Sequence, residues 1–182
     1  LDEISACKTL GTFDTGLLSP IEPDVDFQIG DLTLEPFSIH HDAANPVAYR
    51  VSHERKSVAV ATDMGHYDQY VIDHLKDLDA LLLEANHDVN MLETGPYPYY
   101  LKTRIASQRG HLCNEENAAT LVRLLENGCE RFALCHISQE NNTPELALES
   151  VRAALLGAGV VPGRDCVVNA ARRHEVSPII EF

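Results

Sequence analysis

The sequence is poor in basic residues: its 182 residues include 14 lysines and arginines against 28 aspartates and glutamates, a formal net charge of −14. A protein that binds nucleic acid through a broad electrostatic surface is normally basic, so this class is disfavoured. A nuclease that contacts phosphate through bound cations is not excluded, because metal ions change the local field. The sequence also lacks a run of about 20 apolar residues, the length that spans a bilayer, so we expect no membrane partner.

The five cysteines form no C-x-x-C pair, and their number is odd. This pattern argues against a disulfide framework or a zinc knuckle and favours a reducing cytoplasm. Cys129, Cys135 and Cys166 lie near or within apolar runs and are predicted to be small buried hydrophobes. The hydrophobic content of 45% and the charged content of 23% are close to globular averages, so we expect a folded core.

Hydrophobic periodicity predicts an α/β fold that changes character near residue 63. Strands and turns dominate before this point, and strands alternate with helices after it. The predicted strands cover 27–37 (as a hairpin), 47–53, 57–62, 80–83, 132–135 and 165–169. The predicted helices cover 1–10, 68–78, 89–94, 99–107, a segment with Asn114 as N-cap, and a segment from Thr143 (N-cap) and Pro144 to about Leu156.

Three predicted strands lead to potential metal ligands. A strand over 34–39 leads to His41, the strand over 57–62 to Asp63, and the strand over 132–135 to His136. If the three strands lie in one sheet, their ends can converge at one edge, where imidazole nitrogen and carboxylate oxygen suit zinc, manganese or iron. A single histidine at a strand end is more often structural, so this prediction depends on the placement that the three residues share.

Six stretches of the sequence resemble the metallo-β-lactamase superfamily, and most closely its bacterial YycJ (WalJ) branch, related to RNase J and the tRNA 3′-end endonucleases. The stretches are 27–33 (FQIGDLT), 41–46 (HDAANP), 61–65 (ATDMG), 83–88 (LEANHD), 109–114 (RGHLCN) and 136–145 (HISQENNTPE). Their order and spacing fit along the whole chain. The resemblance implies the αββα sandwich of that superfamily.

The resemblance also implies roles for individual residues. It makes His41 and His136 metal ligands and Asp63 a carboxylate that bridges two metals. It makes His111 the histidine that protonates the leaving group or holds the phosphate. The alternative for His111 is a histidine that merely flanks the following helix.

Other residues lie in these stretches without a settled role. Glu84 and His87 belong to a signature of the family, and Glu84 fits buried support of the ligands as well as direct function. Asn141 and Asn142 precede a predicted helix N-terminus whose N–H groups could receive a phosphate. The alternative for this loop is plain capping of the helix by Thr143.

The main metal motif of the superfamily, His-x-His-x-Asp-His, is absent from the sequence. In the family it lies in the N-terminal part, so residues 1–182 are expected to be the C-terminal two-thirds of a single metallo-β-lactamase-fold domain, incomplete at the N-terminus. We therefore expect partial or no metal occupancy and little activity from these residues alone. We also expect an apolar sheet face that the missing segment or another subunit would cover.

For the intact protein, the resemblance implies a metal-dependent hydrolase in which two divalent cations activate a water for attack on a phosphodiester. The substrate implied is a single-stranded DNA or RNA end, with a 5′-to-3′ DNA exonuclease as the first hypothesis. One alternative is a small-molecule hydrolase on the same fold, acting on a phosphodiester, thioester or lactone, which the acidic composition slightly favours. The other is a non-catalytic fragment that needs its missing half or a partner.

Overall fold

A computed structural model describes residues 4, 6, 7, 11 and 14–182; the helix predicted over 1–10 falls mainly outside the described residues. The strands are β1 (Phe27–Ile29), β2 (Leu32–Ser38), β3 (Val47–His53), β4 (Lys56–Ala61), β5 (Ala80–Glu84), β6 (Arg131–Cys135) and β7 (Val167–Ala170). The helices are a 3-10 turn (Thr15–Leu17), α2 (Gln69–His74), α3 (Val89–Thr94), α4 (Tyr99–Ile105), α5 (Asn114–Leu125) and α6 (Pro144–Gly157). The predicted α/β class is confirmed.

The seven strands form one sheet in the order β1 to β7, so that each strand pairs with its neighbours in the sequence. The first four strands are antiparallel. Two-residue turns join β1 to β2 and β3 to β4, whereas residues 39–46, which include His41, form a longer loop between β2 and β3. Gly30 adopts the left-handed φ of +59° that the first turn requires. From β4 to β7 the strands are parallel, which requires crossover connections that contain helices. The carboxyl ends of β2, β4, β5 and β6 therefore meet at one edge of the sheet.

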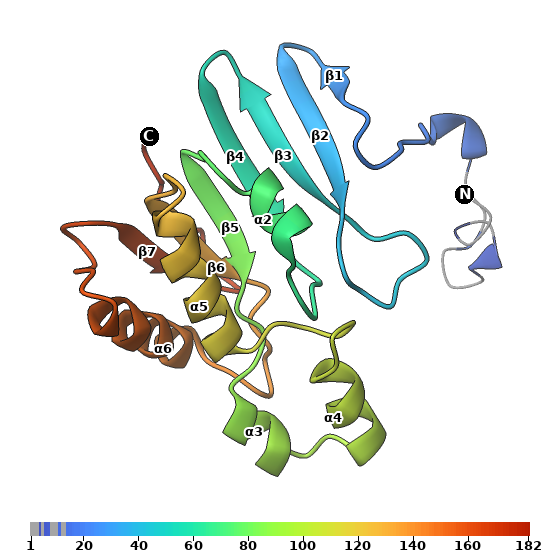
Figure 1. The fold of residues 1–182 in the computed structure, drawn as a ribbon. Coiled ribbons are helices and arrows are strands. Elements are labelled where there is room, and N and C mark those ends of the chain that lie inside the picture. Colours follow the sequence, from blue (N-terminus) through green and yellow to red (C-terminus); the bar gives the residue numbers. More distant parts are fainter. Residues whose placement is uncertain (1–3, 5, 8–10, 12–13) are drawn as a thin grey trace.

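Helices α2, α5 and α6 lie on one face of the sheet (Figure 1). The core between these layers contains fully buried side chains such as Phe37, Leu83, Leu121 and Leu134. Burying such side chains contributes about 1.5–3 kcal/mol each, so this face supplies most of the stability. No described helix covers the opposite face.

The uncovered sheet face is apolar over its central strands. Val60 of β4 lies opposite Leu82 of β5 in the register, and Val60 is 40% exposed. Val58 alternates with the buried Ala59 and so lies on the same uncovered face. The predicted apolar sheet face is therefore present among the described residues.

Most predicted elements are confirmed, with differences at their ends. The helix predicted over 68–78 is shorter: it runs over Gln69–His74 with Leu75 as its C-cap, and the left-handed φ of 52° at Asp77 is incompatible with the predicted end at residue 78. The last strand begins at Val167 and not at residue 165. Thr143 does cap α6, since its Oγ1 accepts from Leu146 N at 3.1 Å.

The prediction that Asn114 is an N-cap is wrong. Cys113 occupies the N-cap position of α5 and makes no side-chain capping bond. Asn114 is the first helical residue, and its amide pairs with the amide of Asn142 inside the molecule. No helix among the described residues has both the length and the apolar composition to cross a lipid bilayer.

Candidate metal centre

Two of the predicted ligands lie just beyond the ends of their strands and have an unusual backbone conformation. Asp63 comes after β4 with a φ of 58°, and His136 comes after β6 with a φ of 52°. A left-handed backbone is uncommon for residues other than glycine, and it concentrates at functional sites where the surroundings enforce it. These sharp turns place both side chains at the carboxyl edge of the sheet.

The structure brings together His41, Asp63, His111 and His136. One oxygen, Asp63 Oδ1, lies 3.7 Å from His41 Nε2, 3.8 Å from His136 Nε2 and 3.8 Å from His111 Nδ1. The ring of His111 lies between the other two, with centroids 5.2 Å from His41 and 5.1 Å from His136. The predicted convergence of strand ends is thus confirmed, whereas the binding of metal by these residues stays a prediction.

In His41 and His136, the ring nitrogen that does not face Asp63 already makes a hydrogen bond. His41 Nδ1 lies 3.1 Å from the carbonyl oxygen of Gly110, and His136 Nδ1 lies 2.7 Å from Glu84 Oε1. An Nδ1–H that donates to an oxygen leaves the Nε2 lone pair free for a metal, which is the usual arrangement of metal-binding histidines. In both residues it is Nε2 that faces Asp63.

Glu84 is the buried centre of this arrangement. Its side chain is inaccessible to solvent, and its Oε1 accepts from the Nδ1 atoms of both His111 and His136 at 2.7 Å. Its Oε2 accepts from Met64 N, also at 2.7 Å. Burial alone would raise the pKa of Glu84, but the hydrogen bonds from the two histidines outweigh it and hold that pKa below its usual value. The same hydrogen bond raises the pKa of His136.

The described residues fit a divalent cation by the chemistry and spacing of their donor atoms. Two groups have potential ligand atoms close together: His41, Asp63 and His111, and Glu84, His111 and His136. In the second group both histidines already hydrogen-bond to Glu84 through Nδ1, so the first group is the better candidate to share an ion. Two ligand atoms on a tetrahedral zinc ion lie about 3.4 Å apart, close to the separations from Asp63 Oδ1. Imidazole and carboxylate ligands also suit manganese and iron, so the donor set does not select one metal.

Two glycines allow the loops of the site to approach each other closely. A Cβ on Gly65 would lie 2.3 Å from the backbone nitrogen of Gly110, and a Cβ on Gly110 would lie 2.2 Å from Ile105 O. Gly65 N also donates to His40 O at 2.9 Å. Both glycines lie in stretches that carry the family resemblance, but the sequence alone assigned them no role.

Two arginines fix the loop that carries His41, and sequence reasoning missed both. Arg104 of α4 holds both carboxylate oxygens of Asp42, with Nη2 to Oδ1 at 2.9 Å, and it keeps the pKa of Asp42 below its usual value. Arg109 Nε donates to the carbonyl oxygen of His41 at 3.1 Å. The only sequence signal for either was its position in or near a motif stretch.

Asn142 and Asn114 form a buried amide pair behind the cluster. Asn142 Nδ2 donates to Asn114 Oδ1 at 2.8 Å and to Ala85 O at 2.9 Å, while its Oδ1 accepts from Asn114 Nδ2 and Thr143 N. Because Asn142 is only 3% exposed and fully hydrogen-bonded, it positions the loop between β6 and α6. In this arrangement it supports the site from behind.

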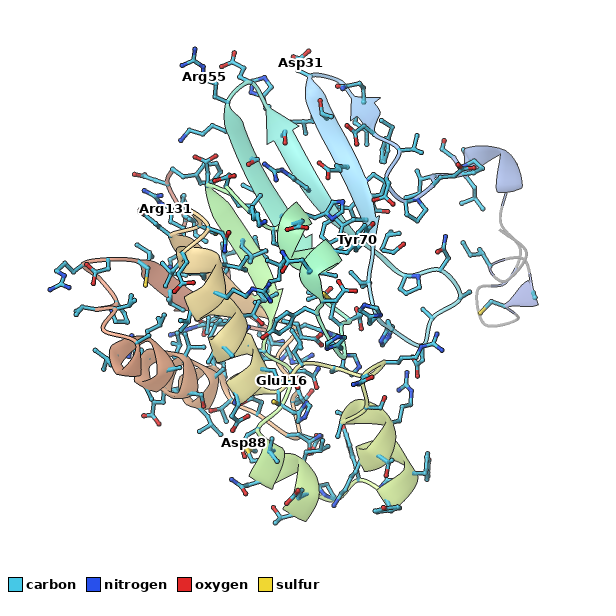
Figure 2. All side chains as sticks on the ribbon, viewed as in Figure 1. Asp31, Arg55, Tyr70, Asp88, Glu116 and Arg131 are labelled. Atoms are coloured by element: carbon cyan, nitrogen blue, oxygen red, sulfur yellow. The ribbon has the colours of Figure 1, made fainter. Side chains whose placement is uncertain are left out.

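His87 and Asn141 are also buried. His87 Nδ1 and Asn141 Oδ1 have no hydrogen-bond partner among the described residues, and burial lowers the pKa of His87. Neither belongs to the groups of potential ligands. Their neighbour Asp88 caps α3 by accepting from Met91 N at 2.8 Å. Figure 2 shows Asp88 near the candidate site's end of the sheet, opposite Asp31 and Arg55.

Known proteins with similar folds and sequences identify the class to which this fold and site belong. The chain resembles the metallo-β-lactamase-fold protein YhfI from Bacillus subtilis with a TM-score of 0.59 and 17% identity, over 84% of this chain and 52% of that one. It resembles Zn²⁺-bound PqqB from Methylobacterium extorquens with a TM-score of 0.56 and 17% identity, over 83% of this chain and 52% of that one. Residues 14–137 match the β-lactamase superfamily domain, and the chain belongs to this superfamily.

Two curated relatives are more similar in sequence. The chain is 38% identical over 175 residues to the exodeoxyribonuclease WalJ of Streptococcus pneumoniae, an alignment that covers 96% of this chain and 65% of the relative. It is 37% identical over 149 residues to the exodeoxyribonuclease YycJ of Bacillus anthracis, covering 82% of this chain and 54% of the relative. The predicted resemblance to the YycJ/WalJ branch is confirmed, and the chain spans 54–65% of the length of these relatives.

Proposed function

We propose that the intact protein is a metal-dependent phosphodiesterase that removes nucleotides from a single-stranded DNA end in the 5′-to-3′ direction. The observation that carries this proposal is the position of Asp63 Oδ1, within 3.8 Å of nitrogens from His41, His111 and His136. Two relatives at 37–38% identity bear the name exodeoxyribonuclease, which supports DNA as the substrate.

The residues have distinct tasks in this proposal. Bound divalent cations would supply an activated water and stabilise the charge that develops on the phosphodiester. His41 and His136 would hold the cations through Nε2, and Asp63 would contact both. His111 would deliver a proton to the leaving oxygen from Nε2, while Glu84 holds its Nδ1 at 2.7 Å and so orients the ring.

We further propose that residues 1–182 supply part of a single domain. The motif His-x-His-x-Asp-His is absent from them, and their uncovered sheet face carries Val58, Val60 and Leu82. The rest of the domain would add ligands and cover this face. The 182-residue chain alone is then expected to hold less than two equivalents of metal and to self-associate. Metal analysis with two tightly bound ions, or light scattering that shows a well-folded monomer, would contradict this.

The proposed compartment is the cytoplasm. Cys113, Cys129, Cys135 and Cys166 are free thiols in the structure. Burial, together with the nearby carboxylates of Glu84 and Asp63, raises the pKa of Cys135 to about 12, which keeps it an unreactive thiol. Thiols that persist unpaired are typical of a reducing environment.

The proposed activity is tested on the intact protein with fluorescently labelled single-stranded DNA and added Mn²⁺. We expect progressive shortening of the strand, inhibited by EDTA, with a 5′ label released before a 3′ label. A His136→Asn variant should be inactive, because asparagine tolerates the left-handed backbone at this position but removes the imidazole. The control His53→Asn changes an exposed histidine at the far edge of the sheet. Turnover of a small ester without DNA cleavage would favour the small-molecule hydrolase.

A further inference from the structure

A cavity of about 370 Å³ opens beside the histidine cluster. Its lining includes His111 and His136 of the cluster, Tyr97 and Leu101 in and before α4, and Arg173 of the segment after β7. Tyr97 lies in the connection between α3 and α4, which extend beyond the carboxyl edge of the sheet (Figure 1). The volume lies within the range of pockets that hold small organic groups. The cavity is therefore a continuation of the candidate centre toward α4.

The walls of this cavity differ in chemistry. Tyr97, Leu101 and Ile105 offer an aromatic ring and aliphatic side chains. The loop after His136 contributes the polar residues Ser138 and Gln139 to the same lining. An aromatic ring and hydrogen-bonding groups in one cavity suit the base of a nucleotide, because a base stacks through its face and hydrogen-bonds through its edge.

Arg173 adds a positive charge to the cavity of an acidic protein. Its Nη2 donates to the carbonyl oxygen of Ile137 at 2.9 Å, so the guanidinium is held against the loop that follows His136. That carbonyl is neutral and does not compensate the charge, whereas Arg104 on the same cavity is paired with Asp42. A guanidinium in this position suits a phosphate, which it contacts through several N–H groups.

We propose that this cavity binds the nucleotide next to the scissile phosphate, with Tyr97 stacked on its base and Arg173 on its phosphate. The proposal depends on the proposed nuclease function and assigns the groups that hold the strand. The base must leave a duplex stack to reach Tyr97 in this cavity, so the site selects an unpaired end. Three of the six tyrosines of the chain, Tyr97, Tyr99 and Tyr100, lie in this connection and the start of α4.

Binding of a labelled single-stranded oligonucleotide to the intact protein in EDTA, followed by fluorescence anisotropy, tests the site apart from cleavage. Tyr97→Ala should weaken binding about tenfold, within the range for loss of one stacked base, and Tyr97→Phe should restore it. Tyr99→Ala is the matched control, since Tyr99 is 84% exposed and does not line the cavity. A blunt duplex should bind more weakly than the single strand.

Two further measurements address Arg173 and the location of the base. Arg173→Ala should reduce the slope of log affinity against log salt by about 0.7, the value for one phosphate contact on a single strand, whereas Arg55→Ala at the far edge of the sheet should not (Figure 2). A terminal 5-iodouracil should photocrosslink to Tyr97 in the wild-type protein.

The outcomes separate this inference from the proposed function. DNA cleavage with an unchanged affinity in Tyr97→Ala, or a crosslink elsewhere on the protein, would overturn the nucleotide site and leave the nuclease standing. Equal affinity for duplex and single strand would also overturn it. A wild-type protein that neither binds nor cleaves DNA would overturn both.

Discussion

Replacing Asp63 with asparagine in the intact protein is expected to lower the rate of phosphodiester cleavage about a thousandfold. The Oδ1 atom of Asp63 faces three histidine nitrogens at 3.7–3.8 Å, so loss of its charge would remove the anionic group that we propose as the ligand between them. Metal ions contribute several kcal/mol to the transition state, and each 1.36 kcal/mol corresponds to a factor of ten, which gives about this loss. Steady-state cleavage of a labelled oligonucleotide at saturating Mn²⁺ measures the effect.

The Asp63→Asn substitution is suited to this test because it preserves the backbone. Asparagine is among the residues that best tolerate the left-handed region, where Asp63 has a φ of 58°. Asp77→Asn is a closely matched control: Asp77 is exposed, has a φ of 52° and lies outside the groups of potential ligands. Its activity should equal that of the wild type. A normal rate in Asp63→Asn would remove the basis of the proposed centre.

Replacing Glu84 with glutamine is expected to weaken metal binding by about 10–100-fold, the usual effect of losing a group that orients a metal ligand. Glutamine has almost the same size but carries no charge to hold the imidazoles of His111 and His136, and its amide nitrogen cannot accept from Met64 N. Because this network is buried, the free energy of unfolding should also fall by about 3 kcal/mol. Metal titration and urea denaturation measure the two effects.

The control for Glu84 is Glu149→Gln, an exposed position on α6. It should change neither quantity, because an exposed carboxylate contributes little to stability. If Glu84→Gln lost stability but kept full metal affinity, Glu84 would serve the fold alone. If it lost neither, the hydrogen bonds to both histidines would have no energetic role, and Glu84 would not organise the centre.

The sequence was most informative where strands end. Apolar runs followed directly by Asp63 and His136 predicted both the strands and the edge at which their ends meet, because parallel strands present their carboxyl ends together. His111 lies before a helix rather than after a strand, so periodicity alone could not place it, and only the family resemblance singled it out.

The rest of the site depends on contacts between residues far apart in the chain. The sequence cannot distinguish a carboxylate at the end of β5 that binds a metal from one that hydrogen-bonds to histidines. Only the 2.7 Å contacts to His111 and His136 show that Glu84 orients these two side chains. Asn114 illustrates the same point, because local capping preferences predicted an N-cap. Its amide pairs instead with Asn142, 28 residues away.

The order of the strands bears on how the centre assembles. Because each strand pairs with its neighbour in the sequence, the sheet can grow by adding one hairpin or one crossover at a time, without closing a long loop first. The residues of the centre are then added in sequence order, from His41 to His136. The hydrogen bond between His136 Nδ1 and Glu84 forms only after β6 has paired with β5. During synthesis, the first strands of the sheet can therefore pair before all the histidines of the centre are in place. Metal binding at the complete centre would then be a late step of the protein's biosynthesis.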